Sequence, residues 1–171
     1  MTDNLIFDTS ALFNFGHRGE LGFLLDRMAG HYRLYTTDKV VTEIRDPKRK
    51  EYYEKFVKKH FTVEKPGDSG ISAEQFLRLS VTLHTGEISV ILLAACLKGR
   101  PVLDDQAARA EAAKLGLNVT GTLGLLNDAI LRKWLTDSEC LARVAKLCDA
   151  HFNIPRPAPH QTFAEYVRAL E

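Results

Sequence analysis

Residues 5–12 have the sequence LIFDTSAL, and this stretch decides the fold class. A short apolar run ends at Asp8, and two hydroxyl residues, Thr9 and Ser10, precede the apolar residues of the next segment. Serine and threonine are favoured where helices begin, because their hydroxyls accept backbone N–H bonds there. The stretch therefore predicts a buried strand, a tight turn and a helix.

The same alternation continues along the chain. Strands are predicted at 5–7, 32–36, 61–63, 100–103 and 117–119. Helices are predicted from 11, at 21–28, 39–45 with Asp38 as the cap, 48–59, after caps at Ser72 and Thr85, at 106–115, 122–134 and 137–149, and from 162. Strands separated by helices favour a parallel sheet covered on both faces. We expect an α/β fold, a three-layer α/β/α sandwich whose central, mainly parallel sheet has four to five strands, with added C-terminal helices.

Length and composition point to one core. A chain of 171 residues with 45% hydrophobic content buries one sizeable core. We expect a main domain at 1–135 and a helical extension at 136–171, packed on the same domain. The net charge of +1 excludes a surface coated in basic charge. Three cysteines without C-x-x-C spacing favour a reduced, cytoplasmic protein. The apolar stretch 88–97 is shorter than the roughly 20 residues of a membrane span, so no membrane is expected.

Acids stand where two predicted strands end. Asp8 ends the first strand, and the doublet Asp104-Asp105 follows the fourth. Ligands of parallel α/β sheets bind beyond the carboxyl ends of the strands, so these acids are expected to meet at one edge. Glu87 lies in an apolar helical segment, where a carboxylate needs a compensating partner.

Each acid also has a structural explanation. Asp8 can accept N–H bonds at a helix start. Glu43 can lie on a solvated helix face and pair with Lys39. One acid of the doublet can cap the helix at 106, which leaves the other unexplained. Taken together, however, four carboxylates repel one another unless a cation neutralises them, and such oxygen-rich clusters suit Mg²⁺ or Mn²⁺ and not zinc.

With these residues in view, the chain resembles the PIN-domain family, and within it the VapC-like branch of predicted nucleic-acid-binding proteins. The resemblance extends from Leu5 to about Trp134. The similar segments are 5–12, 40–44 (VVTEI), 86–90 (GEISV), 102–109 (VLDDQAAR) and 117–124 (LNVTGTLG). The third acid is Glu where many toxins of the branch have Asp, and the stretch after Asp137 does not match the short toxin pattern.

The resemblance implies a metal-dependent endoribonuclease that hydrolyses RNA phosphodiester bonds, and a toxin of a toxin–antitoxin pair is one form of it. The implied catalytic residues are Asp8, Glu43, Glu87 and Asp105. The implied ligands of Mg²⁺ or Mn²⁺ are Asp8, Glu87, Asp105 and Asp104. The implied auxiliary hydroxyls, holding metal-bound water or phosphate, are those of Thr9, Ser10 and Thr120.

Partners are expected to be RNA, single-stranded or structured, an antitoxin protein and a second copy of the chain. The segment 45–59 is rich in basic residues, and its Lys48, Arg49 and Lys50 are the predicted RNA contacts. Interleaved aromatics there can stack on bases, or can face the core of an ordinary amphipathic helix. The C-terminal helices can equally pack on the domain or form a dimer contact.

Three other classes compete. A haloacid-dehalogenase phosphatase needs a second acid two residues after the first, where this chain has Ser10. A receiver domain needs its acid pair early, whereas this doublet comes late. The remaining alternative is a catalytically idle PIN-like module that binds RNA or a protein partner.

Overall fold

A computed structural model describes residues 3–16, 20–45, 47–150, 152 and 154–170, with the backbone alone at 47–49. Its centre is a sheet formed by β1 (Asp3–Phe7), β2 (Tyr32–Thr37), β3 (Thr62–Glu64) and β4 (Arg100–Val102). Within the described residues the strand order is β3-β2-β1-β4, and each neighbouring pair is parallel. The parallel sheet predicted from the sequence is confirmed.

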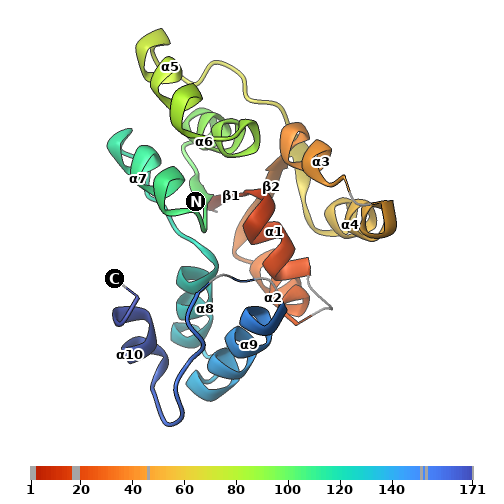
Figure 1. Cartoon of the computed structure of the whole chain (residues 1–171). Helices are drawn as coiled ribbons and strands as arrows, with labels where there is room; N and C mark the ends of the chain where they lie inside the picture. The colour runs from red at the N-terminus through yellow and green to blue at the C-terminus, as the bar shows by residue number, and fades with distance from the viewer. Residues whose placement is uncertain (1–2, 17–19, 46, 151, 153, 171) are drawn as a thin grey trace.

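Helices cover both faces of this sheet. The helices are α1 (Thr9–Gly16), α2 (Gly22–Met28), α3 (Asp38–Glu43), α4 (Pro47–His60), α5 (Ala73–Thr82), α6 (Thr85–Leu97), α7 (Gln106–Lys114), α8 (Thr122–Leu131), α9 (Asp137–Ala150) and α10 (Phe163–Arg168). Helices α5, α6 and α7 lie on one side of the strands, and α1, α2, α8 and α9 lie on the other (Figure 1). The fold is therefore the predicted α/β/α sandwich.

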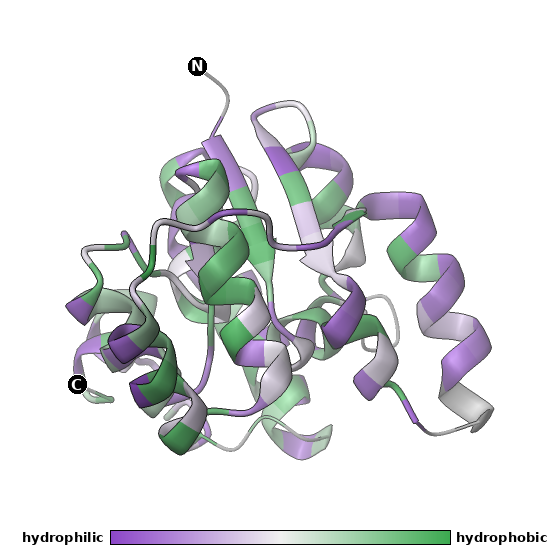
Figure 2. Cartoon of the chain, turned by 90° about the horizontal axis from the view of Figure 1, so that it is seen from above, coloured by the Kyte–Doolittle hydropathy of each residue, from purple (hydrophilic) through white to green (hydrophobic). Residues whose placement is uncertain are grey.

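The core is built around β1. Leu5, Ile6 and Phe7 are fully buried, because β1 has a strand on each side and helices above and below. Such strands are apolar on both faces, which explains the continuous apolar run in place of an alternating pattern. The outer helices carry both hydrophilic and hydrophobic residues, as helices with one buried face do (Figure 2).

The predicted last strand, 117–119, is wrong. The chain reaches the sheet only at Thr120, whose bridge to Val102 is parallel. The cause is the end of α7: Gly116 has a φ of 76°, and the N–H of Leu117 turns back to the carbonyl of Ala112. Only Thr120 therefore pairs with β4 before the next helix begins.

Two predicted helix caps are also wrong by one residue. The cap of α3 is Thr37 and not Asp38, because the Thr37 hydroxyl accepts from the N–H of Val40. The N-cap position of α6 is His84 and not Thr85. The Glu87 carboxylate reaches back to the N–H of His84 and so fixes where this helix starts.

The C-terminal helices pack on the rest of the chain. Val144 and Leu147 of α9 and Phe163 of α10 are buried, and both helices contact α8. The apolar face of α9 is therefore used within the chain. Among the described residues, no helix combines the length and the apolar character needed to cross a membrane.

Candidate active site

Asp8 lies where β1 gives way to α1. Its N–H donates to the carbonyl of Val102, 3.2 Å away, which continues the pairing of β1 with β4 past the end of the strand. One carboxylate oxygen accepts from the N–H of Ala11 at 2.8 Å, so the predicted capping role is present. Asp8 is only 2% exposed, and a cap does not require a buried carboxylate. Its burial therefore remains to be explained.

Glu43 lies at the end of α3 and faces the other acids. Its Oε1 accepts from the N–H of Gly86 at 2.9 Å, and its Oε2 accepts from the hydroxyl of Thr9. The alternative pairing with Lys39 is wrong, because both oxygens of Glu43 turn inward. Thr9 and Gly86 come from α1 and α6, so Glu43 ties three helices together.

Gly86 leaves room for this carboxylate. A Cβ at residue 86 would lie 2.5 and 2.6 Å from the two oxygens of Glu43. We expect Gly86→Ala to displace Glu43 and to lower the affinity of the acids for Mg²⁺ or Mn²⁺ roughly 10–100-fold, as loss of a supporting contact does. The free energy of unfolding should change by about 1 kcal/mol or less, because alanine favours helix where glycine does not. Metal titration and thermal melts measure the two effects.

Gly67→Ala is the matched control, because a Cβ there meets nothing within 4 Å. Unchanged metal affinity in Gly86→Ala would show that the position of Glu43 does not matter for metal binding.

Glu87 lies in the first turn of α6. The start of this helix is fixed against α3 by a chain of hydroxyls. The Ser89 hydroxyl donates to the carbonyl of Gly86 at 2.6 Å, and the Thr37 hydroxyl lies 2.6 Å from Ser89. Since α3 carries Glu43, these bonds set the distance between the second and third predicted acids.

The two acids of the doublet have different environments. Asp105 is exposed and caps α7, accepting from the N–H of Ala108 at 2.8 Å. Asp104 accepts from three donors: the N–H and the hydroxyl of Thr122, at 2.7 and 2.6 Å, and the amide of Asn14, at 2.9 Å. Asp104 is thus the acid that the helix cap left unexplained, and it joins α8 to α1.

The acids act on one another electrostatically. Burial, followed by repulsion from Asp104, raises the pKa of Asp8 well above its ordinary value, and Glu87 and Glu43 add to the effect. Burial also raises the pKa of Glu87, and Asp105 adds to that rise. Burial raises the pKa of Asp104 against the hydrogen bonds of Thr122. These five acids therefore form one group of mutually repelling carboxylates, which we call the acid cluster. Its members are Asp8, Glu43, Glu87, Asp104 and Asp105.

This cluster has the chemistry of a site for a hard cation. Its donors are carboxylates, and among the described residues Arg109 lowers the pKa of Asp104 and His84 that of Glu87 only as minor causes. Mg²⁺ and Mn²⁺ prefer oxygen donors of this kind. In the part of the chain that the structure describes, no three Asp, Glu, His or Cys side chains form a ready-made metal site. The donor types fit a cation, and the carboxylates would have to close around it.

The remaining predicted residues lie in several places. Ser10 is exposed, whereas Thr120 is buried with its hydroxyl against Gly124. Lys50 is exposed and lies 3.9 Å from Glu54, and the side chains of Lys48 and Arg49 fall outside the described residues.

The aromatic residues of α4 serve mainly in packing. Tyr53 and Phe56 are buried in the core, and the Tyr52 hydroxyl donates to the carbonyl of Gly16 at 2.6 Å. The core-facing alternative therefore holds for Tyr53 and Phe56.

Sequence reasoning missed the residues that hold Asp104. Asn14 is 1% exposed, a buried amide in an otherwise apolar helix, and that mismatch was the available signal. A Cβ on Gly121 would lie 2.8 Å from a carboxylate oxygen of Asp104 and from the carbonyl of Leu103. The turn at residues 120–122 therefore depends on a glycine.

A family model described as PIN domain matches residues 4–163. The chain belongs to the PIN-domain family. PIN domains are in general nucleases that typically use divalent metals, so the chain has a nuclease fold. The match runs past residue 135 and includes α9.

Solved structures share the fold of this chain. One is the crystal structure of PAE2754 from Pyrobaculum aerophilum, with 16% sequence identity and a TM-score of 0.51. The alignment covers 75% of this chain and 97% of that one. At this identity the likeness speaks for the fold alone. No curated protein gives a match.

Proposed function

We propose that this PIN domain is an endoribonuclease that hydrolyses RNA phosphodiester bonds with Mg²⁺ or Mn²⁺. The observation that carries the proposal is the burial of mutually repelling carboxylates at the carboxyl ends of β1 and β4. An uncompensated buried charge destabilises a fold, so its presence here needs a function. A bound cation removes the repulsion and supplies that function.

The acids have separate roles in this proposal. Asp8, Glu87 and Asp105 would hold the metal, which when bound polarises the scissile phosphate and activates water. Asp104 already accepts hydrogen bonds from three protein donors, so its role is to hold α1 and α8 in place around the site. Its charge also repels that of Asp8. Glu43, fixed by Thr9 and Gly86, orients the attacking water through one of its oxygens.

Cleavage of a labelled single-stranded RNA tests the proposal. We expect cutting with Mg²⁺ or Mn²⁺ and none with EDTA. Metal at 100 times its dissociation constant should also raise the free energy of unfolding by about 2.7 kcal/mol. If varied RNAs stay intact and neither metal changes the melting temperature, the metal site does not exist and the nuclease proposal falls.

A second function, binding without catalysis, is favoured by the structural bonds of the acids. Asp8, Glu87 and Asp105 each accept from a backbone N–H near a helix start, which is a sufficient use for a carboxylate. Such a module would bind RNA with equal affinity in EDTA and in Mg²⁺.

The toxin role is a narrower form of the nuclease proposal. In that role an antitoxin would cover the acid cluster, and the protein could act as a dimer. Expression of the wild type, but not of Asp8→Asn, would then arrest growth.

A further inference from the structure

A pocket of about 580 Å³ lies between α3, α5 and α6. Ligand sites in proteins span about 300–1,000 Å³, so its size suits a small organic group. Its walls include the apolar side chains of Phe76, Leu83, Ile88 and Leu92, and Lys39 and Lys65 also line it. An apolar interior bordered by cations suits a ligand with a flat apolar part and a negative part.

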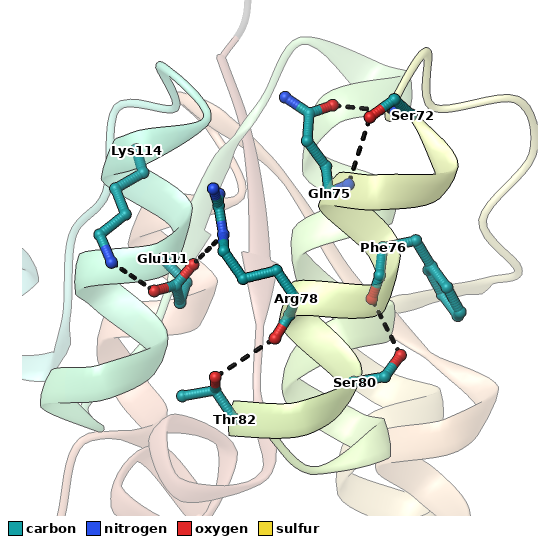
Figure 3. Close-up of polar contacts among 8 residues, drawn as sticks. All are labelled: Ser72, Gln75, Phe76, Arg78, Ser80, Thr82, Glu111 and Lys114. Atoms are coloured by element: carbon teal, nitrogen blue, oxygen red, sulfur yellow. Dashed lines mark hydrogen bonds and ion pairs between the residues drawn. The ribbon is translucent and has the colours of Figure 1, made fainter.

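The Phe76 side chain is exposed on a helix that is firmly held. Leu79 is fully buried and anchors α5 to the core, and Arg78 donates to Glu111 of α7 at 2.9 Å. Figure 3 shows Arg78 directed toward Glu111 and Phe76 directed to the other side of α5. Phe76 remains 47% exposed, so it is not what anchors the helix. The ring is already in place for a partner to stack on it.

The charges at the pocket favour an anion. Lys39 and Lys65 are both exposed, and neither forms an ion pair within the described residues. Asp38 is the acid among the residues that line the pocket, so the two ammonium groups outnumber it. Phosphate groups of a nucleic-acid strand complement this pair.

The pocket and the acid cluster share two helices. In α6, Thr85 and Ser89 line the pocket, whereas Gly86 and Glu87 belong to the cluster. In α3, Lys39 lines the pocket and Glu43 belongs to the cluster. These helices pack against each other, so the pocket and the acid cluster are built on the same pair of helices.

We propose that this pocket binds one unpaired nucleotide of the RNA, flanking the bond that is cut. Its base stacks on Phe76, and Lys39 and Lys65 contact the adjoining phosphates. This inference rests on the proposed function and adds a binding site for one nucleotide to it. A base inside a duplex is not available for stacking on a side chain, so the pocket selects single-stranded RNA.

Binding of a short fluorescent single-stranded RNA to the Asp8→Asn protein in EDTA tests the pocket apart from catalysis. Phe76→Ala should raise the dissociation constant roughly tenfold, as expected for loss of one base stack. Lys39→Gln with Lys65→Gln should flatten the slope of log Kd against log salt by about 1.4, or about 0.7 per phosphate. A 4-thiouridine in the RNA should crosslink to the peptide 73–82.

Leu77→Ala and Val81→Ala are the matched controls, because both side chains are exposed on α5 and neither lines the pocket. Unchanged RNA affinity in Phe76→Ala would overturn the inference and assign this face of α5 to a protein partner. Metal-dependent cleavage by the wild type would still stand in that case. Loss of RNA affinity in the controls equal to that in Phe76→Ala would overturn it as well.

Discussion

Asp8→Asn should abolish RNA cleavage and at the same time stabilise the metal-free protein. Groups that merely support metal ligands contribute 10–100-fold, so loss of a ligand should lower kcat/KM by more than about 100-fold. Asparagine keeps the oxygen that accepts from Ala11, and it is as good an N-cap as aspartate. It removes a buried charge repelled by Asp104, so the free energy of unfolding should rise by about 1–3 kcal/mol.

The pH dependence of this gain follows from the direction of the Asp8 pKa shift. The pKa of Asp8 is raised in the folded protein above its ordinary value of 3.8, so the folded state holds the proton more tightly than the unfolded state does. The wild type therefore loses stability as pH rises from about this value through the raised one. Melts of wild type and Asp8→Asn should nearly coincide at low pH and separate toward pH 8.

Metal should reverse the order of stability, because Mg²⁺ or Mn²⁺ binds the wild type and not the variant. Asp8→Ala serves as the control: it removes the same charge but also the cap, and should be about 1 kcal/mol less stable than Asp8→Asn. A metal-free Asp8→Asn protein that melts below the wild type at pH 8 would contradict the repulsion argument.

Asp104→Ala and Asp105→Asn should separate stability from activity. Asp104→Ala leaves the buried N–H and hydroxyl of Thr122 without their acceptor, and the Asn14 amide keeps only its bond to the Thr122 hydroxyl. At about 1–3 kcal/mol for each of these two unsatisfied groups, the free energy of unfolding should fall by about 2 kcal/mol or more. Asp105→Asn retains the cap of α7, so it should change stability little and lower kcat/KM by more than about 100-fold.

Denaturant unfolding and steady-state kinetics on both variants measure this contrast. Asp105→Ala is the matched control for stability, with an expected loss of about 1 kcal/mol from the missing cap. Normal cleavage by Asp105→Asn would move the ligand role to Asp104 and change the proposed metal site.

The elements that form the sheet could be predicted because their signals are local. The apolar run 5–7 and the acid after it identify a buried strand and its carboxyl end, and the structure places both as expected. The prediction of a strand at 117–119 was wrong because the turn at Gly116, which ends α7, keeps the chain away from the sheet until Thr120. Apolar composition alone does not reveal such a turn.

The candidate site was only partly visible in the sequence. The acids stand out because charged residues at strand ends and in apolar helices are unusual. Their partners do not, because Asn14 and Thr122 are far from Asp104 in the chain and have no pattern in common with it. Gly86 of α6 lacks a Cβ and so leaves room for the Glu43 carboxylate of α3. This depends on how the two helices cross, which the periodicity of apolar residues in the sequence does not specify. Long-range geometry of this kind needs coordinates.

The bonds to Asp104 also determine when the site can form during synthesis. Asp104 is joined to Asn14, 90 residues earlier, and to Thr122, 18 residues later. Chains leave the ribosome from the N-terminus and fold as whole units. In a nascent chain whose residue 122 is still inside the ribosome, Asp8, Glu43 and Glu87 are already present. Helix α8, which fixes the acids that follow β4, has not yet formed. The proposed nuclease is therefore inert until residue 122 has left the ribosome.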